Sequence, residues 1–313
     1  MKQAAAMAGV ILALATLAVA QQPAPANSAP PKTPSGQNQT APADPAAGQA
    51  APATGKRPPQ AKTQAEYDAY NAAKAQANDP AAFEKATNDF ATKFPDSELT
   101  VLMYRDAMHA YQTANNADKM LEMGRKVLKL DKDDPEALIG VAEVLTERTR
   151  DTDLDKAQRM EEAVNDANHA LETIDTDIAV PPNTPQERID AYKNFLRSGA
   201  YAILGTQAFN ANSFPDAEKF FRKSIEAFAS QPDAVVVLRL ALALDKQGKY
   251  PEALKEANHA VELTQDGTTA GQLSRRERDR LVQLTGGAAP GAAATPALAP
   301  GTPAPAAPPT PKN

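Results

Sequence analysis

The chain has 313 residues, with no cysteine, no tryptophan and 27 prolines, and its formal net charge at pH 7 is −6. The absence of cysteine excludes disulfides, thiolate metal sites and a cysteine nucleophile. Six basic residues and one acidic residue lie outside positions 63–285, so this central part carries −11, which argues against nucleic acid and anionic membranes as partners.

The first 20 residues predict a secretory signal peptide. Lys2 precedes an apolar run from Ala4 to Ala20, and the run ends in a small-x-small cleavage pattern, Ala18-Val19-Ala20. An uncleaved anchor is the alternative, but the run is slightly short for a bilayer crossing and is interrupted by small residues. We therefore expect an exported protein, periplasmic or secreted, with no membrane insertion after cleavage.

Two further segments predict disorder. Residues 21–62 and 286–313 consist almost wholly of Ala, Pro, Gly, Gln, Ser and Thr, and they hold 18 of the 27 prolines. Such segments bury too little apolar surface to offset the entropy of ordering, so we expect a disordered linker and a disordered tail, in part polyproline II. Only residues 63–285 can form a core.

Between positions 63 and 285 the pattern is one helix after another. Prolines in the first turn mark helix starts at Pro80, Pro135, Pro215 and Pro251, and strand patterns are nearly absent. An eleventh, arginine-rich helix supplies the polar outer face that a terminal cap needs. The predicted ranges are 63–77, 80–94, 97–114, 117–131, 135–149, 155–175, 185–211, 214–230, 233–248, 251–264 and 270–284.

One motif occurs twice, 90 residues apart, as AVNDANHALE at 163–172 and ALKEANHAVE at 253–262. Each reads as a helix with alanines every three or four positions, which makes a flat stripe that lets a neighbouring helix approach closely. Recurrence at long spacing, with helix-breaking residues between, indicates a stacked helical array.

The fourth predicted helix pair contains a more specific pattern. Tyr201-x-x-Leu204-Gly205 lies in its first helix, and Ala217-x-x-x-Phe221 follows in the second. This spacing resembles the tetratricopeptide repeat (TPR) family. The resemblance implies an all-α, tetratricopeptide-like α-solenoid of about five helix pairs plus a C-terminal capping helix. It also implies a concave groove, lined by the first helix of each pair, in which a peptide lies.

The groove residues follow from that resemblance. Two successive first helices would present a partly apolar strip, with Phe209 as an exposed aromatic anchor. Family members that grip a C-terminal carboxylate use Lys and Asn at matching sites, and their absence here favours a neutral or basic apolar peptide. The predicted strip comprises Ala202, Thr206, Phe209, Val235, Leu238 and Leu242.

No catalytic or metal site is predicted. Of the three histidines, His169 and His259 occupy equivalent places in the repeated motif, and all three are interpreted as packing or surface residues. A set of acidic residues imitates a calcium loop, but Lys156 stands where that loop needs a glycine, so calcium is not expected. The set is Asp151, Asp153, Asp155 and Glu162.

The sequence thus predicts a non-enzymatic scaffold or adaptor of the bacterial cell envelope. It would bind a protein or peptide partner in the concave groove, use no cofactor, and exist as a monomer or weak homo-oligomer. Two alternatives remain open. The chain could be a self-associating structural protein that buries the same strip between copies, or an accessory subunit of an envelope enzyme.

Overall fold

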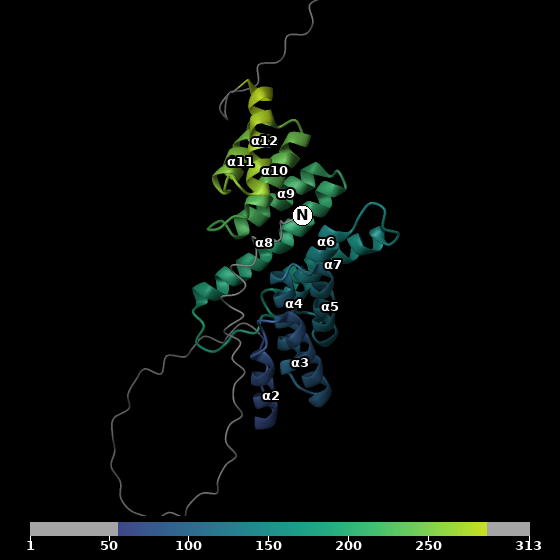
Figure 1. Cartoon of the computed structure of the whole chain (residues 1–313). Coiled ribbons are helices and arrows are strands. Elements are labelled where there is room, and N and C mark those ends of the chain that lie inside the picture. The colour runs from purple at the N-terminus through teal and green to yellow at the C-terminus, as the bar shows by residue number, and fades with distance from the viewer. Residues whose placement is uncertain (1–55, 287–313) are drawn as a thin grey trace, which may run out of the picture.

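The computed structural model describes residues 56–286, which form eleven helices (Figure 1). The predicted signal peptide, most of the linker and nearly all of the C-terminal tail lie outside the described residues. The helices are α2 (Gln64–Lys74), α3 (Pro80–Lys93), α4 (Leu99–Thr113), α5 (Ala117–Leu130), α6 (Pro135–Arg148), α7 (Lys156–Thr173), α8 (Gln186–Asn210), α9 (Phe214–Ala227), α10 (Ala234–Lys246), α11 (Tyr250–Glu262) and α12 (Thr269–Thr285).

The helices pack as sequential pairs. The five pairs are α2/α3, α4/α5, α6/α7, α8/α9 and α10/α11, and α12 packs on α11 as a cap. The second helix of each pair also packs on the next first helix, and first helices contact one another along α4, α6, α8, α10 and α12. In Figure 1 the array runs from α2 at one end to α12 at the other. The predicted all-α array of helix pairs is confirmed.

Local sequence explains where the helices begin. The Asp79 carboxylate accepts hydrogen bonds from the backbone N–H groups of Ala81 and Ala82, and Pro80 occupies the first helical position. The side chains of Asp134 and Asp233 likewise accept hydrogen bonds from backbone N–H groups in the first turns of α6 and α10. These side chains satisfy N–H groups that have no partner inside the helix, which is why the predicted ranges lie so close to the observed ones.

The core is divided among neighbouring pairs and depends on small residues. The predicted stripe Ala163, Ala167 and Ala170 is fully buried, as are the corresponding alanines of α11. On α8, a Cβ at Gly205 would lie only 2.5 Å from the ring of Phe221, which is fully buried. Gly205 therefore allows α8 and α9 to approach closely.

The linker prediction is wrong for residues 56–62. Ala61 is buried, Lys56 forms an isolated parallel bridge with Ala179, and Arg57 makes two 2.8 Å hydrogen bonds to Glu98. This Arg57 pair, more than any other contact, holds the pKa of Glu98 below its usual value. The composition of 21–62 hid these contacts, because the basic residues that make them lie only at its end.

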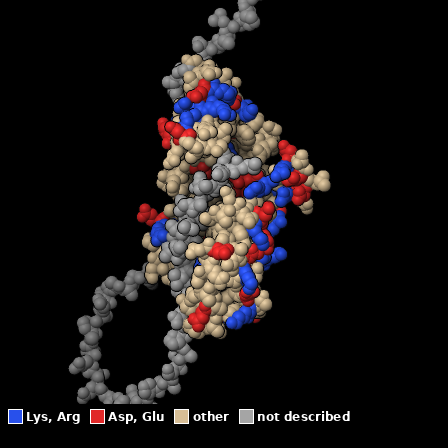
Figure 2. Space-filling model, in the orientation of Figure 1, with Lys and Arg blue, Asp and Glu red and all other residues tan. Residues whose placement is uncertain are grey.

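Charged groups are unevenly distributed over the surface. Figure 2 shows Lys and Arg gathered over α12 and mixed charges along one flank, beside a broad uncharged area. None of the helices between residues 56 and 286 combines the length and apolar character that a bilayer crossing needs.

Candidate functional site

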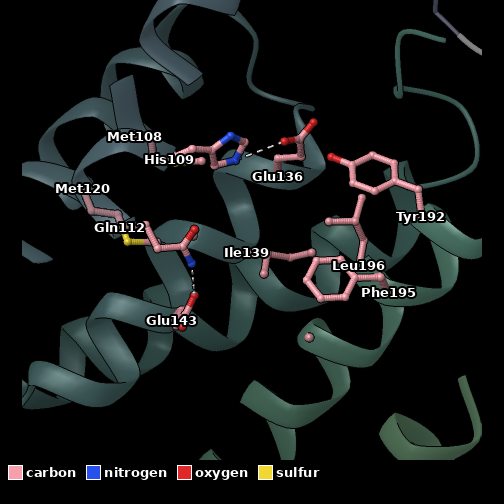
Figure 3. A pocket seen from close by; sticks show the side chains of 12 residues that line it. Met108, His109, Gln112, Met120, Glu136, Ile139, Glu143, Tyr192, Phe195 and Leu196 are labelled. Atoms are coloured by element: carbon pink, nitrogen blue, oxygen red, sulfur yellow. Dashed lines mark hydrogen bonds and ion pairs between the residues drawn. The ribbon is translucent and has the colours of Figure 1, made fainter. Parts of the chain in front are cut away.

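Three successive first helices line a small, partly open cavity of about 30 Å³ (Figure 3). On α6 and α8 the lining positions repeat with the spacing i, i+3, i+4 and i+7, so each helix presents a single face. The set is Glu136, Ile139, Gly140 and Glu143 on α6, Tyr192, Phe195, Leu196 and Gly199 on α8, and Met108, His109 and Gln112 on α4, with Met120 of α5 behind them.

One end of this cavity is an ionic cluster. The Arg105 guanidinium lies 3.0 Å from Asp134 Oδ2 and 3.2 Å from Glu136 Oε1. The second oxygen of Glu136 lies 3.2 Å from His109 Nε2, and the Tyr192 hydroxyl also donates a hydrogen bond to Glu136. Since Arg105 and His109 belong to α4, Asp134 and Glu136 border α6, and Tyr192 belongs to α8, the cluster ties three helix pairs together.

The cluster keeps Glu136 ionised. Burial alone would raise the pKa of Glu136, but Arg105, His109 and Tyr192 together lower it to about 2. For Asp134, burial outweighs the opposing charge of Arg105, so the pKa of the Asp134 carboxyl group is raised. Burial, followed by the charge of Glu136, raises the pKa of Tyr192 well above its usual value, so its phenol stays a hydrogen-bond donor. The carboxylate of Glu136 is therefore already satisfied by its neighbours.

The other end of the cavity is different. Glu143 receives one hydrogen bond from the described residues, at 3.4 Å from Gln112 Nε2. Burial, followed by the charges of Glu147 and Asp233, raises its pKa to about 8 despite the opposing Arg239. At neutral pH this carboxyl group is mostly protonated, because nothing nearby stabilises its charge well.

A second, partly open cavity of about 60 Å³ adjoins the first. The connection between α7 and α8 (174–185) faces the middle of α4 and the start of α6, and its apolar residues Ile178, Val180 and Pro181 form one wall. His109, Glu136 and Tyr192 line both cavities, and Arg105 lines the second. Nδ1 of His109 is buried and has no hydrogen-bond partner among the described residues. The ionic cluster thus separates two hollows of one concave face.

The strip predicted from sequence lies elsewhere, on α8 and α10. These helices do contact each other, but Ala202 and Leu238 are buried, at 7% and 6% exposure. Thr206 accepts a 3.0 Å hydrogen bond from Arg239. Phe209 is half-buried and packs edge-on against Phe214, with ring centroids 5.4 Å apart, so it is not the exposed anchor that the sequence predicts.

The remaining strip residues, Val235 and Leu242, are half-buried. Leu242 packs against the small cluster that contains Leu238 and Ala260. The strip is therefore largely a packing surface between helices. The difference has a physical reason: a helix that is apolar on two sides need not expose either of them, and α9 and α11 pack on α10.

Sequence reasoning missed the cavity between α4 and α8. His109 is not simply a packing or surface residue, because it lines both hollows. A usable signal existed, because two successive first helices carry mixed polar and apolar residues at the same i, i+3, i+4, i+7 spacing, from Glu136 and from Tyr192. Of the other histidines, His169 lies 2.8 Å from Asp133, and His259 is 3.8 Å from Glu256.

Residues 56–286 contain no group of three or more His, Asp or Glu side chains placed to hold a metal ion. In the calcium-like segment, Asp151 pairs with Lys156 at 2.7 Å instead.

Comparisons with known proteins add little to this geometry. No model of a protein family matches the chain, and no curated protein matches it. A solved structure from Thermus thermophilus, described as a thermophilic TPR protein, aligns over 69% of this chain and 99% of its own, with 14% sequence identity and a TM-score of 0.39. At that TM-score the likeness carries no argument about function. What the structure itself shows is an all-α array of helices packed in sequential pairs between residues 56 and 286.

Proposed function

We propose that this protein is an interaction scaffold that receives a segment of a partner protein in the groove between α4, α6 and α8. The observation that carries the proposal is the cavity in Figure 3, where three successive first helices turn equivalent faces toward one space. Stacked helices hold such a surface rigidly, so little conformational entropy is lost when a segment binds.

The lining suits a segment better than a catalytic reaction. Half-buried Phe195 offers aromatic surface beside the buried side chains of Ile139 and Leu196, and such surface supplies most of the affinity in peptide-binding grooves. The ionic cluster around Glu136 is saturated by its neighbours, and it orients α4, α6 and α8.

The proposal includes export to the cell envelope or beyond. Its support is the N-terminal pattern of Lys2, the apolar run to Ala20 and the small-x-small cleavage motif. Mass spectrometry of the N-terminus of protein purified from cells tests this part. A chain starting at Gln21 supports export, and a chain that retains residues 1–20 contradicts signal cleavage.

The groove can be tested with a peptide-display selection on the purified protein. Gly199→Met places a long flexible side chain at the cavity wall, whereas Gly199→Ala adds only a Cβ that would lie 3.5 Å from Ile139 Cγ2, an ordinary contact. We expect peptides selected on the wild type to lose at least about tenfold in affinity for Gly199→Met, a loss equivalent to about 1.4 kcal/mol.

The same peptides should bind Gly199→Ala within about threefold of the wild type, since a difference of that size is under about 1 kcal/mol. Circular dichroism would establish that both variants are folded. If selected peptides bind all three proteins equally, or if no peptide is enriched over a blank surface, the groove is not the binding site.

A further inference from the structure

The two ends of the cavity differ in how well their carboxylates are satisfied. Glu136 has Arg105, His109 and Tyr192 as partners, whereas Glu143 has a single 3.4 Å hydrogen bond from Gln112. No salt bridge reaches Glu143 from the described residues, because Arg239 on α10 donates to Thr206 instead. Figure 3 shows Glu143 and Gln112 at one side of the hollow and Glu136, His109 and Tyr192 at the other.

We propose that the Glu143 end of the cavity binds the lysine or arginine side chain of the partner segment. The Glu143 carboxylate would pair with the cationic group, while half-buried Phe195 would lie against its methylene stem. This inference rests on the proposed function, and it specifies the chemistry of the partner: an otherwise apolar segment with one basic residue.

Shape and chemistry of the wall favour a basic side chain over other occupants. Lys and Arg have long apolar stems that lie along apolar surface while the charged end reaches a polar group. An aromatic ring such as Phe195 adds attraction for a cation above its face. An acidic side chain would meet the charges of Glu147 and Asp233, which oppose it just as they oppose the ionisation of Glu143.

The charge of the whole array agrees with this choice. Residues 63–285 carry −11 by sequence, so a basic segment is attracted from a distance and an acidic one is repelled. An uncharged apolar segment would leave Glu143 buried beneath it with only Gln112 as partner, which costs free energy. A basic side chain removes that cost.

Binding should also depend on pH. A cationic partner stabilises ionised Glu143, so below its free pKa of about 8 binding must release a proton, and affinity should fall by up to about tenfold for each pH unit. The charged groups that act on Glu143 are Glu147 on α6, Asp233 at the cap of α10 and Arg239 on α10, and the fourth titratable group, His109 on α4, lies at the opposite end of the cavity. Glu143→Gln keeps all four and removes only the carboxylate.

The test uses arrayed nonapeptides with acetylated and amidated ends. Their flanks vary over Ala, Leu, Phe and Pro, and their central residue is either arginine or citrulline, which has nearly the same shape without the charge. On the wild type at pH 8, we expect the best arginine peptides to bind at least about tenfold more tightly than their citrulline partners.

On Glu143→Gln, the ratio should fall to within about twofold, and the binding of citrulline peptides should be unchanged. The matched control is Glu147→Gln, one turn along α6 on an exposed position, which should keep most of the preference. Between pH 8 and pH 6 the wild-type preference should shrink, and the variant should show no such change.

Two results would overturn the inference alone. In one, arginine and citrulline peptides bind the wild type equally well, yet Gly199→Met weakens the binding of both. The peptides would then bind in the groove without any preference for a basic side chain. In the other, the preference survives in Glu143→Gln. If no peptide binds in a way that Gly199→Met disturbs, both this inference and the proposed function fail.

Discussion

Gly199 and Gly205 lie six residues apart on α8 and meet different neighbours. A Cβ at position 199 would have only Ile139 Cγ2 nearby, at 3.5 Å, whereas a Cβ at position 205 would overlap the buried Phe221 ring. We expect Gly199→Ala to stabilise the protein by about 0.5–1 kcal/mol, because glycine is costly inside a helix. We expect Gly205→Ala to destabilise it by about 1–3 kcal/mol through overpacking.

Urea denaturation followed by circular dichroism measures both changes in the free energy of unfolding. The two variants make the same chemical change in the same helix, so each serves as the control for the other. Equal effects of the same sign would contradict the difference in packing described for the two faces of α8.

Residue-scale prediction from the sequence succeeded where a motif encodes a contact. Leu204-Gly205 followed by Ala217-x-x-x-Phe221 indicated a close helix pair, and Gly205 and Phe221 indeed lie against each other. It failed for Phe209, because the partner that half-buries it, Phe214, belongs to no motif. The environment of Glu143 was equally hidden, since it depends on residues of α4, α8 and α10.

At the scale of elements, the cluster around Arg105 joins α4, α6 and α8. Arg105→Met keeps an apolar stem of similar length but leaves Asp134 and Glu136 buried without their cation. Breaking a buried ion pair from one side costs about 3–5 kcal/mol, so we expect a loss of stability of about 3 kcal/mol at pH 7. Thermal unfolding measures it, and a change below about 1 kcal/mol would show that the cluster contributes little.

The same cluster predicts sensitivity to acid. The pKa of Glu136 is lowered from 4.5 to about 2 in the folded state, so its ionised form stabilises the fold above pH 4.5. That contribution is lost as the pH falls from 4.5 toward 2, because the unfolded chain takes up the proton first. Glu136→Gln should be less stable at pH 7 and should lose less stability over this range, as acid titrations of unfolding would reveal.

The positions of the helices were the best-predicted feature, because they depend on residues close together in the sequence. Helix starts are set by residues within one turn, such as Asp79 with Pro80 and Asp134 with Pro135, and these can be read directly from the chain. Which helix faces converge is not local. The cavity depends on the angles at which α4, α6 and α8 stack, and those angles follow from packing between residues that lie far apart in the sequence.

At the scale of the whole molecule, each helix pair contacts mainly its neighbours in sequence. Stability in such arrays is nearly a sum of local terms. We therefore expect Gly205→Ala to speed amide hydrogen exchange in α8, α9 and α10 while leaving α2 and α3 close to wild type. Exchange that rises equally along the array would indicate a single cooperative unit instead.

Residues 56–62 are the exception to this neighbour-by-neighbour order. Lys56 lies 2.6 Å from Asp131 and bridges Ala179, both far along the chain from α2. Tension applied to the chain upstream of Lys56 would therefore reach the array first at the end of α5 and the connection before α8. The first helix pair would bear load only after that bridge and the Arg57–Glu98 pair had parted, so the first contacts to resist the pull belong to segments far along the chain from α2.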